Sequence, residues 1–434
     1  MSRVITITGL AFGGRGVGRI NGKAVFVPYA APGDEAEVEI VSEKKGYSEA
    51  VITGLLKSSA GRAEPLCRYY GLCGGCSWQH LSYETQAAWK QRILGDALER
   101  IGGIKDVAFD EPALSRSPFH YRGRARLHSR GGRMGFYEAG SRRLVDVDEC
   151  PLLEPPVNEA FRELRKALNG KAPFDEVEIA AGADGKTAAA FHVRGRPDNG
   201  FIKTIGRAAV IAGFEIINAA NGRRVWSQGE TLLAGGVMGM AIAAGVSGFS
   251  QVNRAQNEVM AAKAVEYAGL TGAERVLDLY CGAGNLSLPL ALRAGRVTGV
   301  EADREAVKQA GRNAGLNNIV NAAFHASDAA GWLRRGARPF KNEDKEIREN
   351  VKILERGGPD VVILDPPRDG EGGAARLLGE SRIPRIVYVS CNPPALARDA
   401  RLLARSGYRL SRAGLIDMFP QTYHIESIAR FDLA

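Results

Sequence analysis

The sequence predicts an α/β protein whose C-terminal part is a doubly wound, mostly parallel β-sheet. A small β-barrel and a central α+β region precede this sheet. Segments with period-two alternation come first, a cysteine-rich stretch follows, and strand and helix patterns alternate towards the C-terminus. A chain of 434 residues is too long for one ordinary core. We expect three domains, at residues 1–58, 59–245 and 246–434.

The first domain is predicted from the strand-like segments "VITITGL", "KAVFVPYA" and "EAEVEIVSEKKGYSEAVITGLL". Turns containing Gly-Gly, Asn-Gly and Pro-Gly-Asp separate them, and short strands at this spacing indicate an OB-like β-barrel. Its loops carry several basic side chains. RNA contact and a merely solvated basic surface explain them about equally well: Arg15, Arg19, Lys23, Lys44 and Lys45.

The central region mixes helix and strand patterns. The stretch "SYETQAAWKQRILGDALERIG" has helical periodicity, whereas "FHYRGRARLHSRGGRMGFYEAG" alternates arginines with apolar residues. On a strand these arginines share one face, which is either an RNA-facing surface or the solvated side of a sheet. A charged, partly helical insertion is expected at residues 335–358, and it suggests no function.

The third domain is predicted from a repeated strand–helix order. The helix "NRAQNEVMAAKAVEYAGL" leads to the strand "RVLDLY", a glycine turn, the helix "LSLPLALRAG" and the strand "RVTGVEA". The strands "AAFHASDA", "DVVILDPPR", "RIVYVSCNPP" and "HIESIARFDL" follow. A sheet of this type binds ligands at the carboxyl ends of its strands.

The composition favours a soluble protein with a polyanionic partner. Apolar residues make up 45% and charged residues 25%, and 58 Lys and Arg against 49 Asp and Glu give a net charge of +9. The N-terminal stretch has no apolar core or cleavage site of a signal peptide, and no apolar run is long enough to span a bilayer. We therefore expect a cytoplasmic protein with no membrane partner. The sequence carries no signal of oligomeric state.

The glycine turn in "VLDLYCGAGNLSLPLA" predicts a nucleotide-like ligand. Gly282 and Gly284 let the backbone approach a ligand at the start of a helix, but Ser287 stands where a dinucleotide fingerprint has its third glycine. Glu301 ends the next strand, where a carboxylate can accept hydrogen bonds from two ribose hydroxyls. Together with the later "DPPR", this pattern resembles the S-adenosylmethionine site of class I methyltransferases.

Four of the six cysteines form a candidate metal site. "CRYYGLCGGCSWQH" carries three of them in one loop, and a Cys-Pro in "VDVDECPLL" supplies a fourth. Four thiolates suit zinc or an iron–sulfur cluster, and in a reducing compartment both are more common than unbound thiols. The irregular spacing and the Cys-Pro favour a 4Fe–4S cluster. The proposed ligands are Cys67, Cys73, Cys76 and Cys150.

Two thiols remain, and one of them suggests covalent catalysis. Cys281 lies in the glycine turn and is expected to pack beside the ligand, whereas Cys391 ends a buried strand. Carbon 5 of uracil is a poor nucleophile until a thiolate adds to carbon 6, and a base must afterwards remove the proton from carbon 5. Glu426 is the candidate base, although a glutamate in a strand pattern is more often a surface residue. His424 beside it is structural or tunes Glu426.

With these motifs, the chain resembles a known family over nearly its whole length: the S-adenosylmethionine-dependent RNA uracil-5-methyltransferases. "SCNP" matches the family's nucleophile loop and Glu426 its terminal base. The resemblance implies a TRAM barrel at the N-terminus, a 4Fe–4S cluster on the cysteine quartet, and 5-methyluridine formation in 23S ribosomal RNA with the uridine flipped out. It further implies cofactor contacts by Gln251, Tyr280, Asn285, Glu301, Asp365 and, with a less secure alignment, Asp328.

Two other functions stay open on the sequence alone. One is a transfer RNA enzyme with the same chemistry. The other is a non-catalytic RNA-binding protein with a redox-sensing cluster, which the presence of both Cys391 and Glu426 disfavours. An amino-group methyltransferase would carry an aromatic residue after Asp-Pro-Pro, where this chain has Arg368. The sequence does not indicate which uridine is modified.

Overall fold

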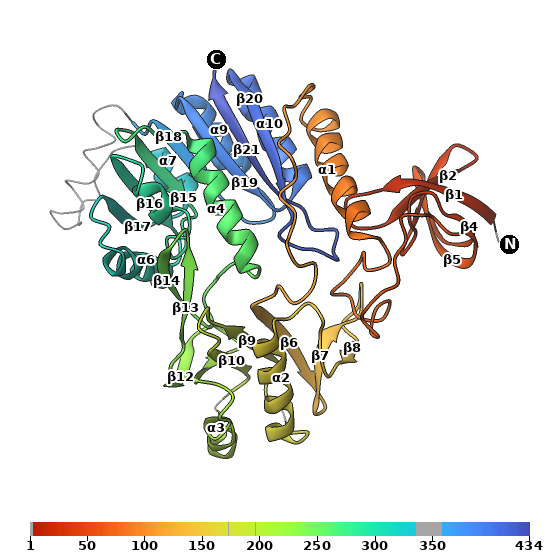
Figure 1. The fold of residues 1–434 in the computed structure, drawn as a ribbon, viewed down its shortest axis with the longest axis horizontal. Coiled ribbons are helices and arrows are strands. Elements are labelled where there is room, and N and C mark those ends of the chain that lie inside the picture. The colour runs from red at the N-terminus through yellow and green to blue at the C-terminus, as the bar shows by residue number, and fades with distance from the viewer. Residues whose placement is uncertain (1–2, 172, 196, 336–357) are drawn as a thin grey trace.

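The protein is described by a computed structural model that covers residues 3–171, 173–195, 197–335 and 358–434. Most of the charged insertion expected at 335–358 therefore lies outside the described residues. Figure 1 shows three parts: the N-terminal strands at one side, the C-terminal sheet above, and a second sheet with its helices below. Within the described residues, no helix is long and apolar enough to cross a membrane.

The N-terminal part is a closed five-stranded barrel, as predicted, with strand order β1-β2-β3-β5-β4. Period-two alternation gives this barrel an apolar interior. Inward residues such as Ile5, Ile7, Val25 and Val38 are at most 2% exposed, while their neighbours face solvent. Several basic loop residues pair with acidic ones in the barrel, for example Lys23 with Glu43 at 3.0 Å. The strands are β1 (Arg3–Leu10), β2 (Gly16–Ile20), β3 (Lys23–Val27), β4 (Glu35–Glu43) and β5 (Tyr47–Lys57).

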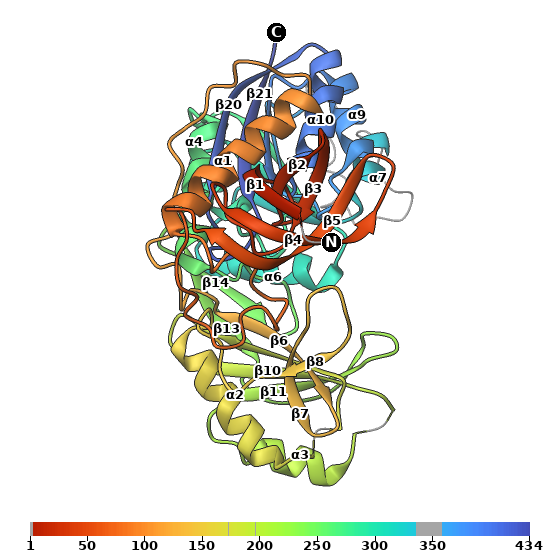
Figure 2. The ribbon, with the colours of Figure 1, turned by 90° about the vertical axis from the view of Figure 1, so that its right-hand side faces the viewer.

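Helix α1 (Tyr83–Arg100) follows the cysteine-rich segment and begins at Ser82, whose side chain accepts a hydrogen bond from the Thr85 amide. Its apolar residues Leu94 and Leu98 enter the core of the C-terminal sheet. Figures 1 and 2 both show α1 lying between the barrel and that sheet. The helix therefore connects the barrel to the C-terminal part.

The central part is a seven-stranded sheet of order β12-β11-β10-β9-β6-β7-β8, mostly antiparallel, with two helices packed on it. Its core is aromatic and aliphatic, with Phe161, Phe191 and Phe214 at most 2% exposed. A separate hairpin, β13 (Leu232–Val237) and β14 (Met240–Gly245), leads towards the third part. The sheet and its helices comprise β6 (Arg124–Arg130), β7 (Arg133–Tyr137), β8 (Leu144–Asp146), α2 (Pro155–Leu168), β9 (Glu176–Ala181), β10 (Thr187–Val193), α3 (Asn199–Gly206), β11 (Gly213–Asn218) and β12 (Arg224–Gly229).

The C-terminal part is the predicted doubly wound sheet, with order β17-β16-β15-β18-β19-β21-β20. Strands β17 to β19 are parallel, and β21 and β20 are antiparallel to their neighbours. Its elements are α4 (Arg254–Ala268), β15 (Arg275–Leu279), α5 (Ser287–Ala291), β16 (Arg296–Glu301), α6 (Arg304–Leu316), β17 (Ala322–Ala326), α7 (Ala329–Arg335), β18 (Val361–Leu364), α9 (Gly372–Ser381), β19 (Arg385–Ser390), α10 (Pro393–Arg405), β20 (Tyr408–Ile416) and β21 (Glu426–Leu433).

The strand ends that form the site lie at one edge of this sheet. The parallel strands β15, β16, β18 and β19 finish there, whereas the antiparallel β21 begins there. Ser390 at the end of β19 is paired with Ser427 near the start of β21. The residues that follow β19 and open β21 are therefore neighbours in space.

Candidate active site

The glycine turn after β15 is held against the end of β16. Tyr280, Gly282 and Gly284 all have positive φ angles (66°, 53° and 93°), which lets the chain reverse tightly before α5. The Gly282 amide donates to Glu301 Oε2 at 3.2 Å, and the Asp303 amide donates to Glu301 Oε1 at 2.9 Å. Glu301 therefore fixes the turn through one oxygen and the start of the next helix through the other.

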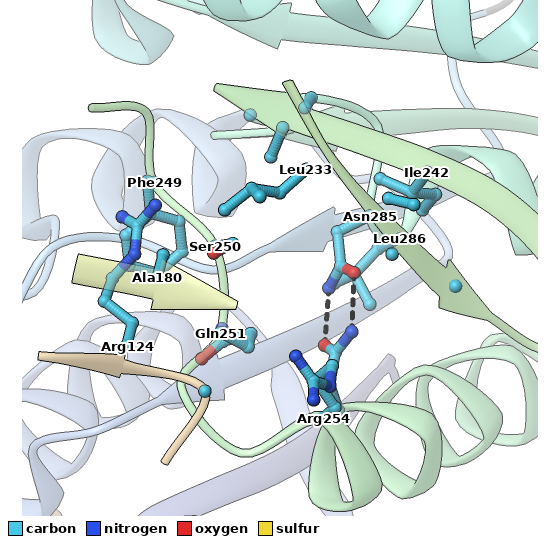
Figure 3. A pocket seen from close by; sticks show the side chains of 18 of the residues that line it. Arg124, Ala180, Leu233, Ile242, Phe249, Ser250, Gln251, Arg254, Asn285 and Leu286 are labelled. Atoms are coloured by element: carbon cyan, nitrogen blue, oxygen red, sulfur yellow. Dashed lines mark hydrogen bonds between the residues drawn. The ribbon is translucent and has the colours of Figure 1, made fainter. Parts of the chain in front are cut away.

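A pocket opens beside this turn and contains about 1010 Å³ of empty space, including its mouth. Its wall comes from the turn, the hairpin β13–β14, the segment before α4 and the strands β6 and β9 (Figure 3). Four of the six cofactor residues expected from the sequence line it: Gln251, Tyr280, Asn285 and Asp365.

The other two expected cofactor residues lie outside the lining of this pocket. Glu301 acts on it through the Gly282 amide described above. Asp328 is exposed, and its carboxylate accepts the Gly331 amide at 2.6 Å at the start of α7. Burial and Glu371 chiefly raise the pKa of the Tyr280 hydroxyl, and the charges of Asp328 and Glu301 add to this shift.

The structure adds supporting residues that the sequence did not reveal. Asn257 of α4 exchanges two side-chain hydrogen bonds of 2.8 Å with Asn285, which orients the Asn285 amide (Figure 3). Arg124 of β6 donates to the carbonyls of Val246 (2.9 Å) and Gly248, directly before Gln251. This arginine of the alternating stretch thus supports the pocket wall. Neither contact has a local sequence signal, because each joins distant segments.

Two buried carboxyl groups adjoin the pocket. Burial raises the pKa of Asp278 to about 7, although Ser287 donates a hydrogen bond to it, and Asp365 and Glu301 raise it further. Burial likewise raises the pKa of Asp365 to about 6. Both carboxyl groups therefore hold a proton more readily than an exposed carboxyl group does, and a positively charged ligand beside them would favour their ionised forms.

The thiol and the carboxyl expected to react are brought together at the neighbouring strand ends. Cys391 follows β19 and Glu426 opens β21, and the side chain of Ser427 donates to the Ser390 carbonyl at 3.0 Å across this junction. Glu426 is 4% exposed, and its Oε1 has no hydrogen-bond partner among the described residues. A buried acceptor without a partner is costly unless a ligand completes it.

The electrostatics of this pair follow from burial and from two neighbours. Burial raises the pKa of the Cys391 thiol to about 11, with Glu426 and Asp365 adding to the shift and Arg368 opposing it. Burial also raises the pKa of Glu426 well above its usual range, Asp365 adds to this, and Arg368 again opposes it. Burial therefore favours the protonated form of both groups. Arg368 is the cation that favours their ionised forms.

The loop that carries Cys391 is tied to the loop that carries Arg368. The Asn392 side chain donates to the Arg368 carbonyl at 2.8 Å and caps α10 by accepting the Ala395 amide at 3.3 Å. Pro393 and Pro394 occupy the first turn of that helix, where their fixed φ suits the helical start. Cys281, by contrast, is 4% exposed and lines the pocket inside the glycine turn.

The four remaining cysteines come from two segments and interact with one another. Burial and the other thiols raise the pKa of Cys73 to about 11 and that of Cys76 to about 12, with Cys67 and Cys150 among the causes in both. Gln79 accepts the Cys67 amide at 3.0 Å, and its buried Nε2 has no partner within the part of the chain that the structure describes. In that same part, no three His, Cys, Asp or Glu side chains are arranged to hold a metal ion.

Comparison with known protein families gives two matches. Residues 238–430 match the family described as tRNA (uracil-5-)-methyltransferase, and residues 3–53 match the TRAM domain. The second match coincides with the five-stranded barrel.

Individual relatives match the chain almost end to end. The 23S rRNA (uracil(1939)-C(5))-methyltransferase RlmD of Shewanella amazonensis is 35% identical, covering 97% of this chain and 93% of the relative. The protein of the same name from Methylococcus capsulatus is 36% identical over 98% and 96%. Among solved structures, the Pyrococcus abyssi tRNA (uracil-54, C5)-methyltransferase in complex with S-adenosyl-L-homocysteine has a TM-score of 0.74 and 25% identity, covering 99% of this chain and all of that one.

Proposed function

The chain belongs to the S-adenosylmethionine-dependent RNA (uracil-5-)-methyltransferases, and from this premise we propose that it forms 5-methyluridine in 23S ribosomal RNA. The observation that carries the proposal is the placement of Cys391 beside Glu426, at the same sheet edge as the pocket next to the glycine turn. A thiol and a carboxyl group at this edge are the two groups that methylation of uracil at carbon 5 requires.

In the proposed reaction Cys391 is the nucleophile. Once the thiol has lost its proton to solvent, its sulfur forms a bond to carbon 6 of the uracil, and the electron pair of the ring double bond moves towards carbon 5 as an enolate. S-adenosylmethionine would supply the methyl group that carbon 5 then accepts, and would leave as S-adenosylhomocysteine. Glu426 removes the proton from carbon 5, the double bond re-forms, and Cys391 leaves carbon 6. Arg368 supports the ionised states of Cys391 and Glu426 that these steps need.

We assign cofactor binding to the residues around the pocket. Glu301 retains acceptor capacity beyond its two backbone contacts and would bind ribose hydroxyls. Asp365 would lie near the reacting centre, since it interacts electrostatically with both Cys391 and Glu426. Gln251, Tyr280 and Asn285 would contact the rest of the cofactor from the pocket wall, with Asp328 at its rim.

The RNA class is proposed from the relatives. The relatives from Shewanella amazonensis and Methylococcus capsulatus, 35% and 36% identical over nearly the whole chain, are named as 23S rRNA enzymes. A transfer RNA substrate is the second candidate, because the solved archaeal relative named for transfer RNA covers both chains almost completely. Its lower identity, 25%, makes ribosomal RNA the first choice.

A 4Fe–4S cluster is proposed on Cys67, Cys73, Cys76 and Cys150. The four thiols are not arranged as a preformed metal site in the described residues, but two observations support the fit. The four thiols interact electrostatically although they come from two segments of the chain, and the Gly75 amide lies 3.4 Å from Cys73 Sγ as a donor to sulfur. The buried Gln79 Nε2 offers a second donor near Cys76. When bound, the cluster would supply structural cross-linking, since no proposed step transfers electrons.

We also propose a division into domains at 1–58, 59–245 and 246–434, and a cytoplasmic location.

The barrel and the central sheet would extend the RNA contact beyond the reacting uridine. A seven-stranded central sheet next to the pocket mouth supports this, since Arg124 belongs to both.

The proposal is tested by measuring single-turnover methylation of a 23S rRNA fragment and of a transfer RNA. Cys391→Ala should abolish methylation and the denaturation-resistant RNA adduct, whereas Glu426→Gln should transfer the methyl group and trap the adduct. Mass mapping of 5-methyluridine in total RNA from cells that lack the gene identifies the substrate. Methylation by Cys391→Ala would refute the covalent mechanism, and a loss confined to transfer RNA would replace the ribosomal substrate.

A further inference from the structure

The loop between β20 and β21, residues 417–425 and here named the base loop, leads directly into Glu426. Helix α1 holds its first part from outside the sheet. The Lys90 ammonium contacts Asp417 Oδ1 at 2.6 Å and donates to the Phe419 carbonyl at 2.9 Å. The side chains of Lys90 and Asp417 are both fully buried. Breaking a buried ion pair of this kind is strongly destabilising.

A second contact from α1 holds the middle of the base loop. The side chain of Gln86, fully buried, accepts the Gln421 amide at 2.8 Å and donates to Gln421 Oε1 at 3.0 Å. Gln421 has a φ of 68°, a left-handed conformation that is uncommon for a residue with a side chain. Such a conformation persists where surrounding contacts determine it. Gln86 supplies two of these contacts.

The segment that directly follows the cysteines supplies the others. The amides of Ser77 and Trp78 donate to the Gln421 carbonyl at 3.1 Å and 3.0 Å. The Tyr423 amide donates to Ser77 Oγ at 2.9 Å. Because Ser77 is adjacent to Cys76, the cysteine-rich segment is joined to the base loop by three hydrogen bonds.

An apolar core surrounds these polar contacts. It contains Leu10 and Ala31 from the barrel, Trp78 and Ile93 from the cysteine-rich segment and α1, and Ile425 next to Glu426. The Trp78 indole also donates to the Gly14 carbonyl of the barrel at 2.9 Å. The base loop therefore rests on three separate parts of the chain.

We propose that the segment after the cysteines and helix α1 position the catalytic base: Ser77 and Gln86 fix the base loop so that Glu426 reaches the proton on carbon 5 of the bound uracil. The inference rests on the proposed role of Glu426. A displacement of about 1 Å at a reacting group is enough to slow a step a hundredfold. Loosening the base loop should slow proton removal and product release more than the earlier methyl transfer, because Cys391 and the pocket lie on other strand ends.

The test uses Ser77→Ala, which removes one side-chain hydrogen bond and leaves the backbone contacts. In single turnover, methyl transfer should stay within about twofold of wild type, while release of methylated RNA slows about tenfold and the methylated adduct accumulates. Ser77→Thr keeps the hydroxyl and should restore release. As a readout that does not depend on activity, hydrogen exchange of the amides in residues 417–425 should become faster in Ser77→Ala.

Ser82→Ala is the matched control, because it removes the side-chain cap of α1 and, among the described residues, Ser82 has no hydrogen bond to the base loop. It should lower the melting temperature but leave the adduct fraction and the exchange of residues 417–425 at the wild-type level. The inference is overturned if Ser77→Ala and Ser82→Ala slow transfer and release in the same proportion. Glu426→Gln is measured in parallel. If it traps no adduct, the assignment of Glu426 as the base fails. If Glu426→Gln traps the adduct and Ser77→Ala does not, only the positioning role is rejected.

Discussion

Burial favours the protonated forms of Cys391 and Glu426, although the proposed chemistry needs a thiolate and a carboxylate. Asp365 adds to both pKa shifts by charge repulsion, and Arg368 opposes both. A thiol that stays protonated is protected from oxidation, because the thiolate is the reactive form.

The raised thiol pKa predicts how alkylation of Cys391 depends on pH. With a pKa of about 11, the thiolate fraction and the alkylation rate should rise about tenfold per pH unit from pH 7 to pH 10 without a plateau. Arg368→Gln should slow alkylation by about three- to tenfold at each pH, because it removes the favourable charge. Peptide mass spectrometry after iodoacetamide treatment measures the rate.

Arg401→Gln, an exposed change on α10, serves as the control and should leave the alkylation rate of Cys391 unchanged. A plateau below pH 8 would mean that the thiolate already exists at neutral pH. An unchanged rate in Arg368→Gln would separate Arg368 from the thiol.

At the scale of elements, the start of α10 determines how firmly the thiol loop is held. Asn392 caps this helix and also links it to the loop after β18 through the Arg368 carbonyl. The two functions use different atoms of one amide, the oxygen for the cap and the nitrogen for the link. Substitution can therefore separate them.

Asn392→Ala should lower the free energy of unfolding by about 1–2 kcal/mol, since it removes a helix cap and a hydrogen bond. Asn392→Ser keeps a cap acceptor and should recover most of that stability while leaving the link to Arg368 broken. Urea unfolding measures the first effect, and single-turnover adduct formation measures the second. Equal stability of Asn392→Ala and wild type would show that the prolines alone start the helix.

At the scale of the molecule, three parts converge on one sheet edge. The barrel and the cysteine-rich segment reach it through the core around Trp78, and the central sheet reaches it through Arg124. Their basic residues are partly used internally, as in the pairing of Arg126 with Glu178 at 2.6 Å. The net charge of +9 nevertheless leaves a surplus for an RNA backbone.

This surplus predicts a steep salt dependence of RNA binding. The logarithm of the association constant should fall linearly with the logarithm of the KCl concentration, by about two decades or more between 50 and 200 mM. S-adenosylmethionine binding, measured by calorimetry over the same range, should change little, because its pocket is partly shielded from screening. A flat salt profile for RNA in filter binding would contradict a backbone-dominated interface.

Local patterns in the sequence were sufficient to predict most elements and the reactive groups that they carry. Period-two alternation in residues 3–57 was enough to predict the barrel, because each inward position must be apolar. The glycine turn, the acidic end of β16 and the cysteine after β19 were equally readable, since each depends on a few adjacent residues. Positions at the ends of parallel strands share an edge, so Asp365 and Cys391 could be expected near the pocket.

Which distant residues meet depends on how the elements pack in three dimensions. The antiparallel insertion of β21 beside β19 brings Glu426 to Cys391, and the pairing of Gln86 with Gln421 joins residues 335 positions apart. Two arginines of β6, open to two interpretations in the sequence, have internal partners: Arg124 supports the pocket wall, and Arg126 pairs with Glu178. Local periodicity specifies which face of an element is apolar, but hydrogen bonds between segments depend on how those faces pack, and no local pattern encodes that.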